Sequence, residues 1–135
     1  MLIAKLIKTK FKFSNLTIID RNKHKLNFAP KNCRKVFLKK SQSKILKKFK
    51  DSFDYVIDTT GSAKIIPTLL NYAKNHASIT LMGNINNDVF FKKKEINLIL
   101  RKELKIIGIW NSNYKNSSQS DWSEVLKLFK KGFKP

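Results

Sequence analysis

The stretch Leu16-Thr17-Ile18-Ile19-Asp20 decides the fold. Its run of apolar and β-branched residues predicts a short buried strand that ends in a carboxylate. Apolar residues at helical spacing precede it, with lysines between them: Leu2, Ile3, Leu6, Ile7 and Phe11. The chain is therefore expected to begin with an amphipathic helix and to continue, after Ser14 and Asn15, into a strand.

The position of Asp20 points to a nucleotide. In a dinucleotide-binding βαβ unit, a glycine-rich turn precedes the first helix, and an acidic residue lies roughly 20 residues after that turn. Counting back from Asp20 puts the turn at or just before Met1. We therefore expect a domain cut just inside its first helix, with the acidic half of the fingerprint present and the phosphate-binding half missing.

Strand-like and helix-like stretches alternate after Asp20. Helices are predicted over 22–29, 43–50 and 62–73, with Ser62 as the N-cap of the last one. Strands are predicted over 36–38, 55–58, 78–82 and 104–110, and a short apolar element over 96–100. A final helix begins at the capping pair Asp121 and Glu124, and its expected buried residues are Trp122, Val125, Leu126 and Phe129.

This alternation predicts an α/β fold: an incomplete Rossmann-like doubly wound parallel sheet that lacks its first strand and glycine-rich turn. Residues 1–135 are expected to form one partial dinucleotide-binding domain. The strands are continuous apolar runs, which indicates a sheet covered on both faces. Because the missing strand is central in the order 3-2-1-4-5-6, we expect a poorly paired seam between strands 16–20 and 55–58.

The formal net charge of +20 has two interpretations. It could serve a polyanionic partner such as nucleic acid, or it could reflect AT-rich coding, since all but three of the 29 basic residues are lysine. We favour coding bias, because nucleic-acid readers usually also employ arginine. The lysines are then expected on all exposed faces, and four phenylalanines are expected in the core: Phe11, Phe49, Phe90 and Phe129.

Composition excludes several classes of protein. No stretch approaches the roughly 20 apolar residues that a membrane span needs. A single cysteine, Cys33, excludes an internal disulfide and a cysteine-rich zinc cluster. The first residues do not read as a signal peptide, because Lys5 and Lys8 interrupt the apolar run. A cytoplasmic location fits these observations.

The strand ends carry a resemblance to a known family. The matching stretches are residues 16–20 with Lys25 and Leu26, then 54–62, 78–83 and 101–112. In this order they resemble the coenzyme-binding domain of zinc-type medium-chain alcohol and polyol dehydrogenases. The last stretch, with Asp121-Trp122 after it, looks most like the sorbitol and galactitol-1-phosphate dehydrogenases.

The resemblance implies NAD as the coenzyme and assigns residues to it. Asp20 matches the carboxylate that binds the ribose hydroxyls and favours NAD over NADP, although the adjacent Arg21 blurs that preference. Lys25 matches a position that reaches the adenosine ribose. The other implied cofactor-binding residues follow three strands of the sheet: Thr60, Gly61, Gly83, Ile109 and Asn111.

The resemblance implies no catalytic residue in this chain. The zinc-binding catalytic domain of the family is expected to be absent, no zinc ligands are predicted, and NAD affinity is expected to be weak or lost. The chain is thus expected to be an inactive fragment of an NAD-dependent polyol dehydrogenase, with a sugar alcohol or its phosphate as the family substrate. Two alternatives stay open: a basic nucleic-acid-binding module, which we consider unlikely, and a subunit of a homo-oligomer or one completed by another chain.

Overall fold

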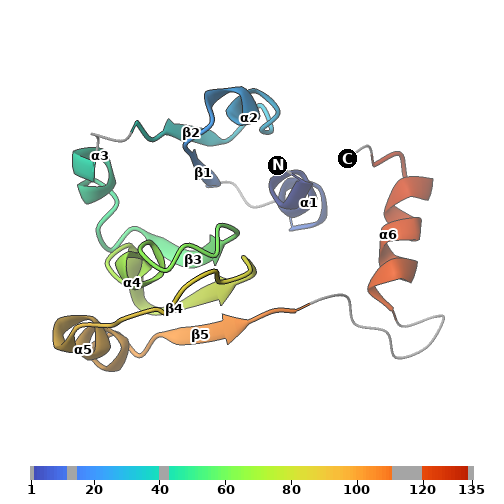
Figure 1. The fold of residues 1–135 in the computed structure, drawn as a ribbon. Helices are drawn as coiled ribbons and strands as arrows, with labels where there is room; N and C mark the ends of the chain where they lie inside the picture. The colour runs from blue at the N-terminus through green and yellow to red at the C-terminus, as the bar shows by residue number, and fades with distance from the viewer. Residues whose placement is uncertain (1, 12–14, 40–42, 111–119, 134–135) are drawn as a thin grey trace. The chain divides into compact units, whose positions relative to one another are not determined.

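The computed structural model describes residues 2–11, 15–39, 43–110 and 120–133. The chain divides into two compact units (Figure 1). Unit 1 comprises Met1–Ile45 together with Tyr114–Pro135, and unit 2 comprises Leu46–Asn113. The helix α3 (Ser43–Lys47) contains the boundary between them.

Unit 1 is built around two parallel strands. Its elements are α1 (Leu2–Phe11), β1 (Thr17–Asp20), α2 (Lys23–Asn27), β2 (Arg34–Phe37) and α6 (Asp121–Lys130). The register between β1 and β2 runs from Thr17 opposite Arg34 to Asp20 opposite Phe37. The buried apolar side chains of this βαβ segment are Leu26, Ala29 and Val36. Asp20 therefore lies at the carboxyl end of a strand that is held in place by its crossover.

Unit 2 is a three-stranded parallel sheet with two helices. Its elements are β3 (Phe53–Asp58), α4 (Ile66–Leu69), β4 (Ala73–Leu81), α5 (Lys93–Arg101) and β5 (Lys105–Gly108). The strand order is β3-β4-β5, so β4 is central. Because all three strands run in the same direction, their carboxyl ends lie at one edge of the sheet.

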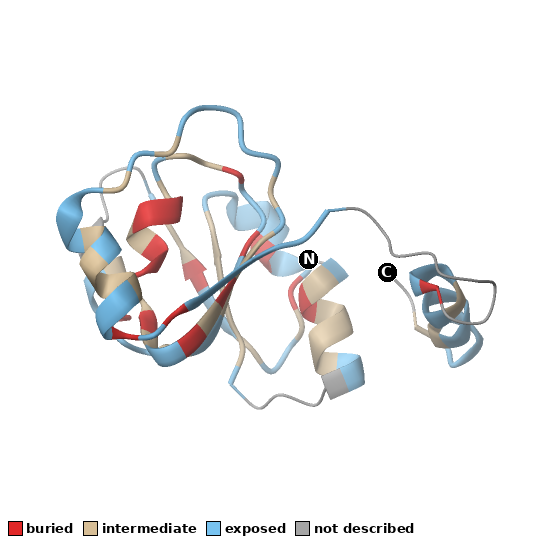
Figure 2. Cartoon of the chain, turned by 90° about the horizontal axis from the view of Figure 1, so that it is seen from below, coloured by how far each residue is buried: buried red, intermediate tan, exposed pale blue. Residues whose placement is uncertain are grey.

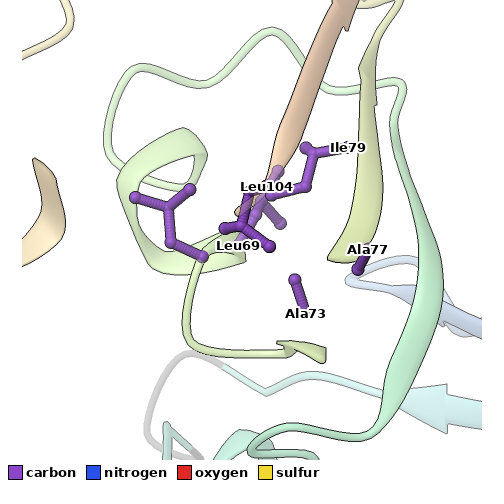
Figure 3. Close-up of a cluster of buried hydrophobic side chains, with 6 residues drawn as sticks. Leu69, Ala73, Ala77, Ile79 and Leu104 are labelled. Atoms are coloured by element: carbon purple, nitrogen blue, oxygen red, sulfur yellow. The ribbon is translucent and has the colours of Figure 1, made fainter. Parts of the chain in front are cut away.

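The core of unit 2 is formed by the end of α4, by β4 and by the residue just before β5. A close-up shows Leu69, Ala73, Ala77, Ile79 and Leu104 converging there (Figure 3). Leu70 and Ile79 are the largest side chains that are fully buried. Partly buried side chains from β3, β4 and α5 surround this cluster, among them Val56, Leu81 and Leu98.

The parallel strands with helical crossovers confirm the predicted α/β class. The lack of pairing expected between strands 16–20 and 55–58 is also found among the described residues. Among the described residues, β1 pairs only with β2 and β3 pairs only with β4, so the strands form two separate sheets. No helix of the described chain is long and apolar enough to cross a membrane.

The prediction that both faces of the sheet are covered is wrong for unit 2. Tyr55 and Ile57 are exposed on β3, and every residue of β5 is exposed. Figure 2 colours the exposed parts of the chain pale blue and the buried parts red. Side chains alternate between the faces of a strand, so Val56 faces the core while Tyr55 and Ile57 face away from it. Within unit 2, the apolar side chains on the second face of β3 have no covering layer.

The helix predicted over 62–73 is much shorter than expected. Only α4, residues Ile66–Leu69, is helical, and Ile65 rather than Ser62 is its N-cap residue, without a side-chain cap. The strand β4 already begins at Ala73. The amides of Ser52 and Phe53 both donate to the carbonyl of Tyr72, at 2.9 and 3.1 Å, which recruits the end of the expected helix into the sheet.

The last helix differs from its prediction in its cap and its buried face. Ser120 and Ser123 form the capping box, in place of Asp121 and Glu124. None of α6 between Asp121 and Lys130 is buried, and Trp122 is 63 % exposed. The expected core positions of Phe90 and Phe129 are likewise wrong, since Phe90 is 80 % exposed, whereas Phe49 is buried as predicted. The side chain of Phe11 lies outside the described residues.

Candidate functional site

The carboxyl edge of the sheet in unit 2 carries a tight turn anchored by Asp58. This last residue of β3 is 4 % exposed. One carboxylate oxygen accepts the backbone N–H of Thr60 at 3.1 Å and its hydroxyl at 2.7 Å. The other accepts the N–H of Gly61 at 3.0 Å. The buried carboxylate therefore fixes the backbone of the two residues that follow the strand.

Gly61 and Gly83 bring the turns after β3 and β4 into backbone contact. Gly61 has a φ of +61°, and a Cβ added there would lie 1.9 Å from the carbonyl oxygen of Asn84. A Cβ on Gly83 would lie 2.1 Å from the amide nitrogen of Gly61. The amides of Met82 and Gly83 both donate to the carbonyl of Asp58. Only glycine fits at both positions, because backbone of the neighbouring turn fills the space that a side chain would need.

The remaining predicted residues of this edge are more exposed. Thr60 is exposed, although its hydroxyl is tied to Asp58. Ile109 follows β5, and its amide donates to the carbonyl of Leu81 at 3.0 Å while its side chain is half exposed. Asn111 lies outside the described residues.

Asp20 ends β1 in unit 1 and is only partly buried. Its Oδ1 accepts the backbone N–H of Asn22 at 2.8 Å, and its own carbonyl accepts the N–H of Leu38. Among the described residues, no hydrogen-bond partner engages Oδ2. One oxygen thus orients the carboxylate, and the other is available to a hydroxyl group.

Arg21 and Lys25 flank this carboxylate in sequence, and both are exposed. Asn22 caps α2, since its side-chain oxygen accepts the N–H of Lys25 at 3.2 Å. The cap places Lys25 in the first turn of α2, directly after Asp20 and Arg21. No ion pair joins Lys25 to a described carboxylate.

The predicted site residues therefore fall into two groups. Asp20, Arg21 and Lys25 lie together in unit 1, whereas Thr60, Gly61, Gly83 and Ile109 follow three adjacent strands of unit 2. Sequence reasoning missed Asp58 as the residue that anchors the second group. An aspartate followed two residues later by threonine and then glycine is a turn signal that would have identified it.

A metal centre is not found within the described part of the chain, where no group of three or more His, Cys, Asp or Glu residues could hold an ion. His24 packs edge-on against Phe28, at 5.2 Å between ring centroids. His76 lies 3.3 Å from Glu103 on the surface. The described residues therefore do not fit a zinc ion, and no chemical step is assigned to one.

Each group, taken by itself, is compatible with part of a nucleotide. In unit 1, a carboxylate at the end of a parallel strand can accept hydrogen bonds from ribose hydroxyls. In unit 2, the turns after β3 and β4 lie at the carboxyl edge of a parallel sheet, where ligands bind in open α/β sheets.

Known proteins are similar to this chain in both sequence and fold. Residues 2–131 match the family model described as "Zinc-binding dehydrogenase". Over 73 residues the chain is 26 % identical to galactitol 1-phosphate 5-dehydrogenase of Escherichia coli (strain K12), an alignment that covers 54 % of this chain and 21 % of that relative. The aligned part is therefore about a fifth of the length of this curated relative.

Solved structures agree on the fold. The crystal structure of galactitol-1-phosphate dehydrogenase from Escherichia coli superposes with a TM-score of 0.68 at 24 % identity, covering 87 % of this chain and 35 % of that one. The structure of S. aureus TarJ in complex with NADPH gives a TM-score of 0.70 at 21 % identity, covering 95 % of this chain and 37 % of that one. By the match over residues 2–131, this chain belongs to the zinc-binding dehydrogenase family.

Proposed function

We propose that this chain is the coenzyme-binding part of a dehydrogenase that transfers a hydride between a sugar alcohol, or its phosphate, and NAD. The observation that carries the proposal is the carboxylate of Asp20 at the end of β1. One oxygen is held by the amide of Asn22, and the other faces no described donor. That is the arrangement a ribose diol needs, because each hydroxyl donates a hydrogen bond to a carboxylate oxygen.

The carboxyl edge of unit 2 offers a further place where a coenzyme could contact the chain. The contact between Gly61 and Gly83 lies at this edge, where ligands bind in open α/β sheets. Asp58 keeps this backbone rigid, because its carboxylate accepts three hydrogen bonds from the turn. The nicotinamide, when bound, accepts or supplies the hydride. The chain's own residues bind and orient it.

The proposed substrate class is taken from the name of a relative with a similar sequence. Galactitol 1-phosphate 5-dehydrogenase shares 26 % identity over 73 residues, so a polyol or polyol phosphate is the substrate we propose for the whole enzyme. The groups that polarise the alcohol would come from outside the described residues, which contain no metal-binding cluster. We therefore expect the 135-residue chain by itself to show no polyol-dependent reduction of NAD.

Ligand-observed NMR of the purified chain with NAD tests the proposal. We expect weak binding in the millimolar range, because a coenzyme held without a glycine-rich phosphate turn loses several charge-assisted hydrogen bonds of roughly 1.5–3 kcal/mol each. Asp20→Ala should abolish the NAD signal, and the matched control Asp54→Ala, an exposed carboxylate of β3, should keep it. Equal NAD signals in the chain and in its Asp20→Ala variant would contradict the proposal.

A second candidate, a subunit completed by another chain, is favoured by one observation. Within the described chain, β1 and β3 each pair with a strand on one side only. A strand supplied by a second polypeptide, followed by a glycine-rich turn, would pair with these edges and provide the phosphate contacts. Adding such a strand-turn peptide should raise NAD affinity at least tenfold, and no change in affinity would rule this candidate out.

A further inference from the structure

Two stripes of side chains in unit 1 line one open pocket of about 570 Å³. The stripe on α1 comprises Lys5, Lys8 and Thr9, at the spacing of one helix face. The stripe along α6 comprises Glu124, Lys127 and Leu128, and it continues at Lys131, the C-cap residue, at the same kind of spacing. None of the proposed coenzyme-binding residues lines this pocket.

The charges around the pocket are unequal. Five lysines line it, including Lys10, against the single carboxylate of Glu124. That carboxylate already accepts hydrogen bonds from Lys10 at 3.2 Å and Lys127 at 3.0 Å. These two hydrogen bonds hold the pKa of Glu124 below its usual value, that from Lys127 having the larger effect. Crowding like charges around one hollow is unfavourable, and a bound anion would relieve the repulsion.

The pocket also has an apolar wall, formed by Pro30, Leu128 and Phe133. Leu128 and Phe133 are partly buried, so the wall is fixed within the unit. The amide of Phe133 donates to the carbonyl of Leu128 at 3.0 Å, which holds the two residues together. The volume falls in the range of roughly 300–1,000 Å³ that is typical of small-molecule sites.

We propose that this pocket binds an organic polyphosphate, of which a nucleoside diphosphate is the simplest member. Lysine ammonium groups bind phosphate as point charges. The apolar wall would contact the ring of the same molecule. This site is separate from the coenzyme site at Asp20 and does not depend on the proposed function.

Calorimetry with ADP on the full 135-residue chain, at low salt, tests the proposal. The double variant Lys5→Gln/Lys131→Gln removes one lysine from each stripe and should weaken ADP binding roughly tenfold, since each exposed contact contributes up to about fivefold. Lys130→Gln is the matched control, because Lys130 lies in the last turn of α6 but does not line the pocket. It should change ADP affinity less than twofold.

One further variant and a second ligand keep the result interpretable. Glu124→Gln removes the carboxylate that lines the pocket and should tighten ADP binding, an opposite sign that loss of folding would not produce. Inorganic pyrophosphate, which has no ribose hydroxyls for Asp20, should also bind and should lose affinity in Lys5→Gln/Lys131→Gln, which separates the pocket from the coenzyme site.

Three results would overturn the proposal. The first is equal weakening by Lys130→Gln and by the double variant, which would show a general charge effect. The second is a pyrophosphate affinity that the double variant leaves unchanged. The third is a single-stranded oligonucleotide that binds more tightly than ADP and depends on Lys5 and Lys131, which would make the pocket a nucleic-acid surface.

Discussion

The two edges of the sheet in unit 2 each bury one charged side chain, but they satisfy it in opposite ways. At the carboxyl edge, Asp58 accepts hydrogen bonds from Thr60 and Gly61, which are two and three residues away. At the amino edge, Lys102 donates to Asp51 at 2.5 Å and to the carbonyls of Leu70 and Ala73 at 2.8 Å. These partners are 51, 32 and 29 residues distant in sequence.

The carboxyl edge belongs to the proposed binding site, whereas the amino edge stabilises the fold of the unit. The local bonds of Asp58 shape one turn and bring its glycine into contact with the turn after β4. The long-range bonds of Lys102 tie the segments before β3, β4 and β5 to one another. Three non-glycine residues with positive φ, Asp51, His76 and Glu103, lie at this amino edge. Backbone strain is tolerated there because the surrounding contacts over-determine it.

Replacing Lys102 by methionine should have the largest effect. The side chain is only 10 % exposed, and its loss leaves two buried carbonyls without their donor. We expect a loss of about 3 kcal/mol in the free energy of unfolding. Urea denaturation measures it, with Lys105→Met on exposed β5 as the control expected to stay within about 0.5 kcal/mol. Equal midpoints for the two variants would show that the amino edge is not the stabilising one.

Gly61→Ala should come next and should affect both stability and binding. The added Cβ would meet the carbonyl of Asn84 at 1.9 Å in a backbone conformation with φ of +61°. We expect about 2 kcal/mol of destabilisation from the clash and the positive φ together, and loss of the NAD signal in NMR. Gly108→Ala is the matched control, because nothing lies within 4 Å of its added Cβ. If Gly61→Ala kept both stability and NAD binding, the glycine contact would have no role.

The same contrast explains what the sequence could predict. The strand 16–20, its terminal carboxylate and the turn at Thr60-Gly61 depend on neighbours in sequence, and the structure confirms them. The start of β4 depends on Ser52 and Phe53, which recruit Tyr72 from a distance, and the helix was therefore predicted too long. The role of Lys102 was missed for the same reason, as its partners lie far along the chain.

The face of α6 was mispredicted for a different reason. Trp122 and Phe129 have the spacing of a buried stripe, but spacing shows only that residues share a face. It does not show whether anything covers that face. The positions of Asp20, which ends β1, and of Gly83, which lies two residues after β4, were predictable because they depend only on where a strand ends. The pocket between the lysine stripes of α1 and α6 was not, because it joins residues about 120 positions apart.

Asp58→Asn should have a smaller effect than the glycine substitution. The amide retains one acceptor oxygen for the bonds from Thr60 but places a donor opposite the N–H of Gly61. We expect about 1–2 kcal/mol of destabilisation by urea denaturation. Asp54→Asn, on the same strand but exposed and paired with Lys74, should change the stability by less than about 0.5 kcal/mol. Similar losses for the two variants would mean that burial of Asp58 is irrelevant to the turn.

The smallest effect is expected at Glu124, whose carboxylate is exposed and contrasts with the buried Asp58. Hydrogen bonds from Lys127 first, and then from Lys10, lower its pKa. A lowered pKa in the folded state favours folding above the unfolded pKa, and this contribution is lost as the pH falls through the folded value. Lys127→Gln should therefore raise the pKa of Glu124 more than Lys10→Gln does, and added salt should narrow the difference between the two pKa shifts.

A carbon-detected NMR titration of the Glu124 carboxyl group, from about pH 2 to pH 7, measures both shifts. A larger rise in Lys10→Gln would reverse this ranking and show that the contact between α1 and α6, rather than the pair within α6, controls the carboxylate.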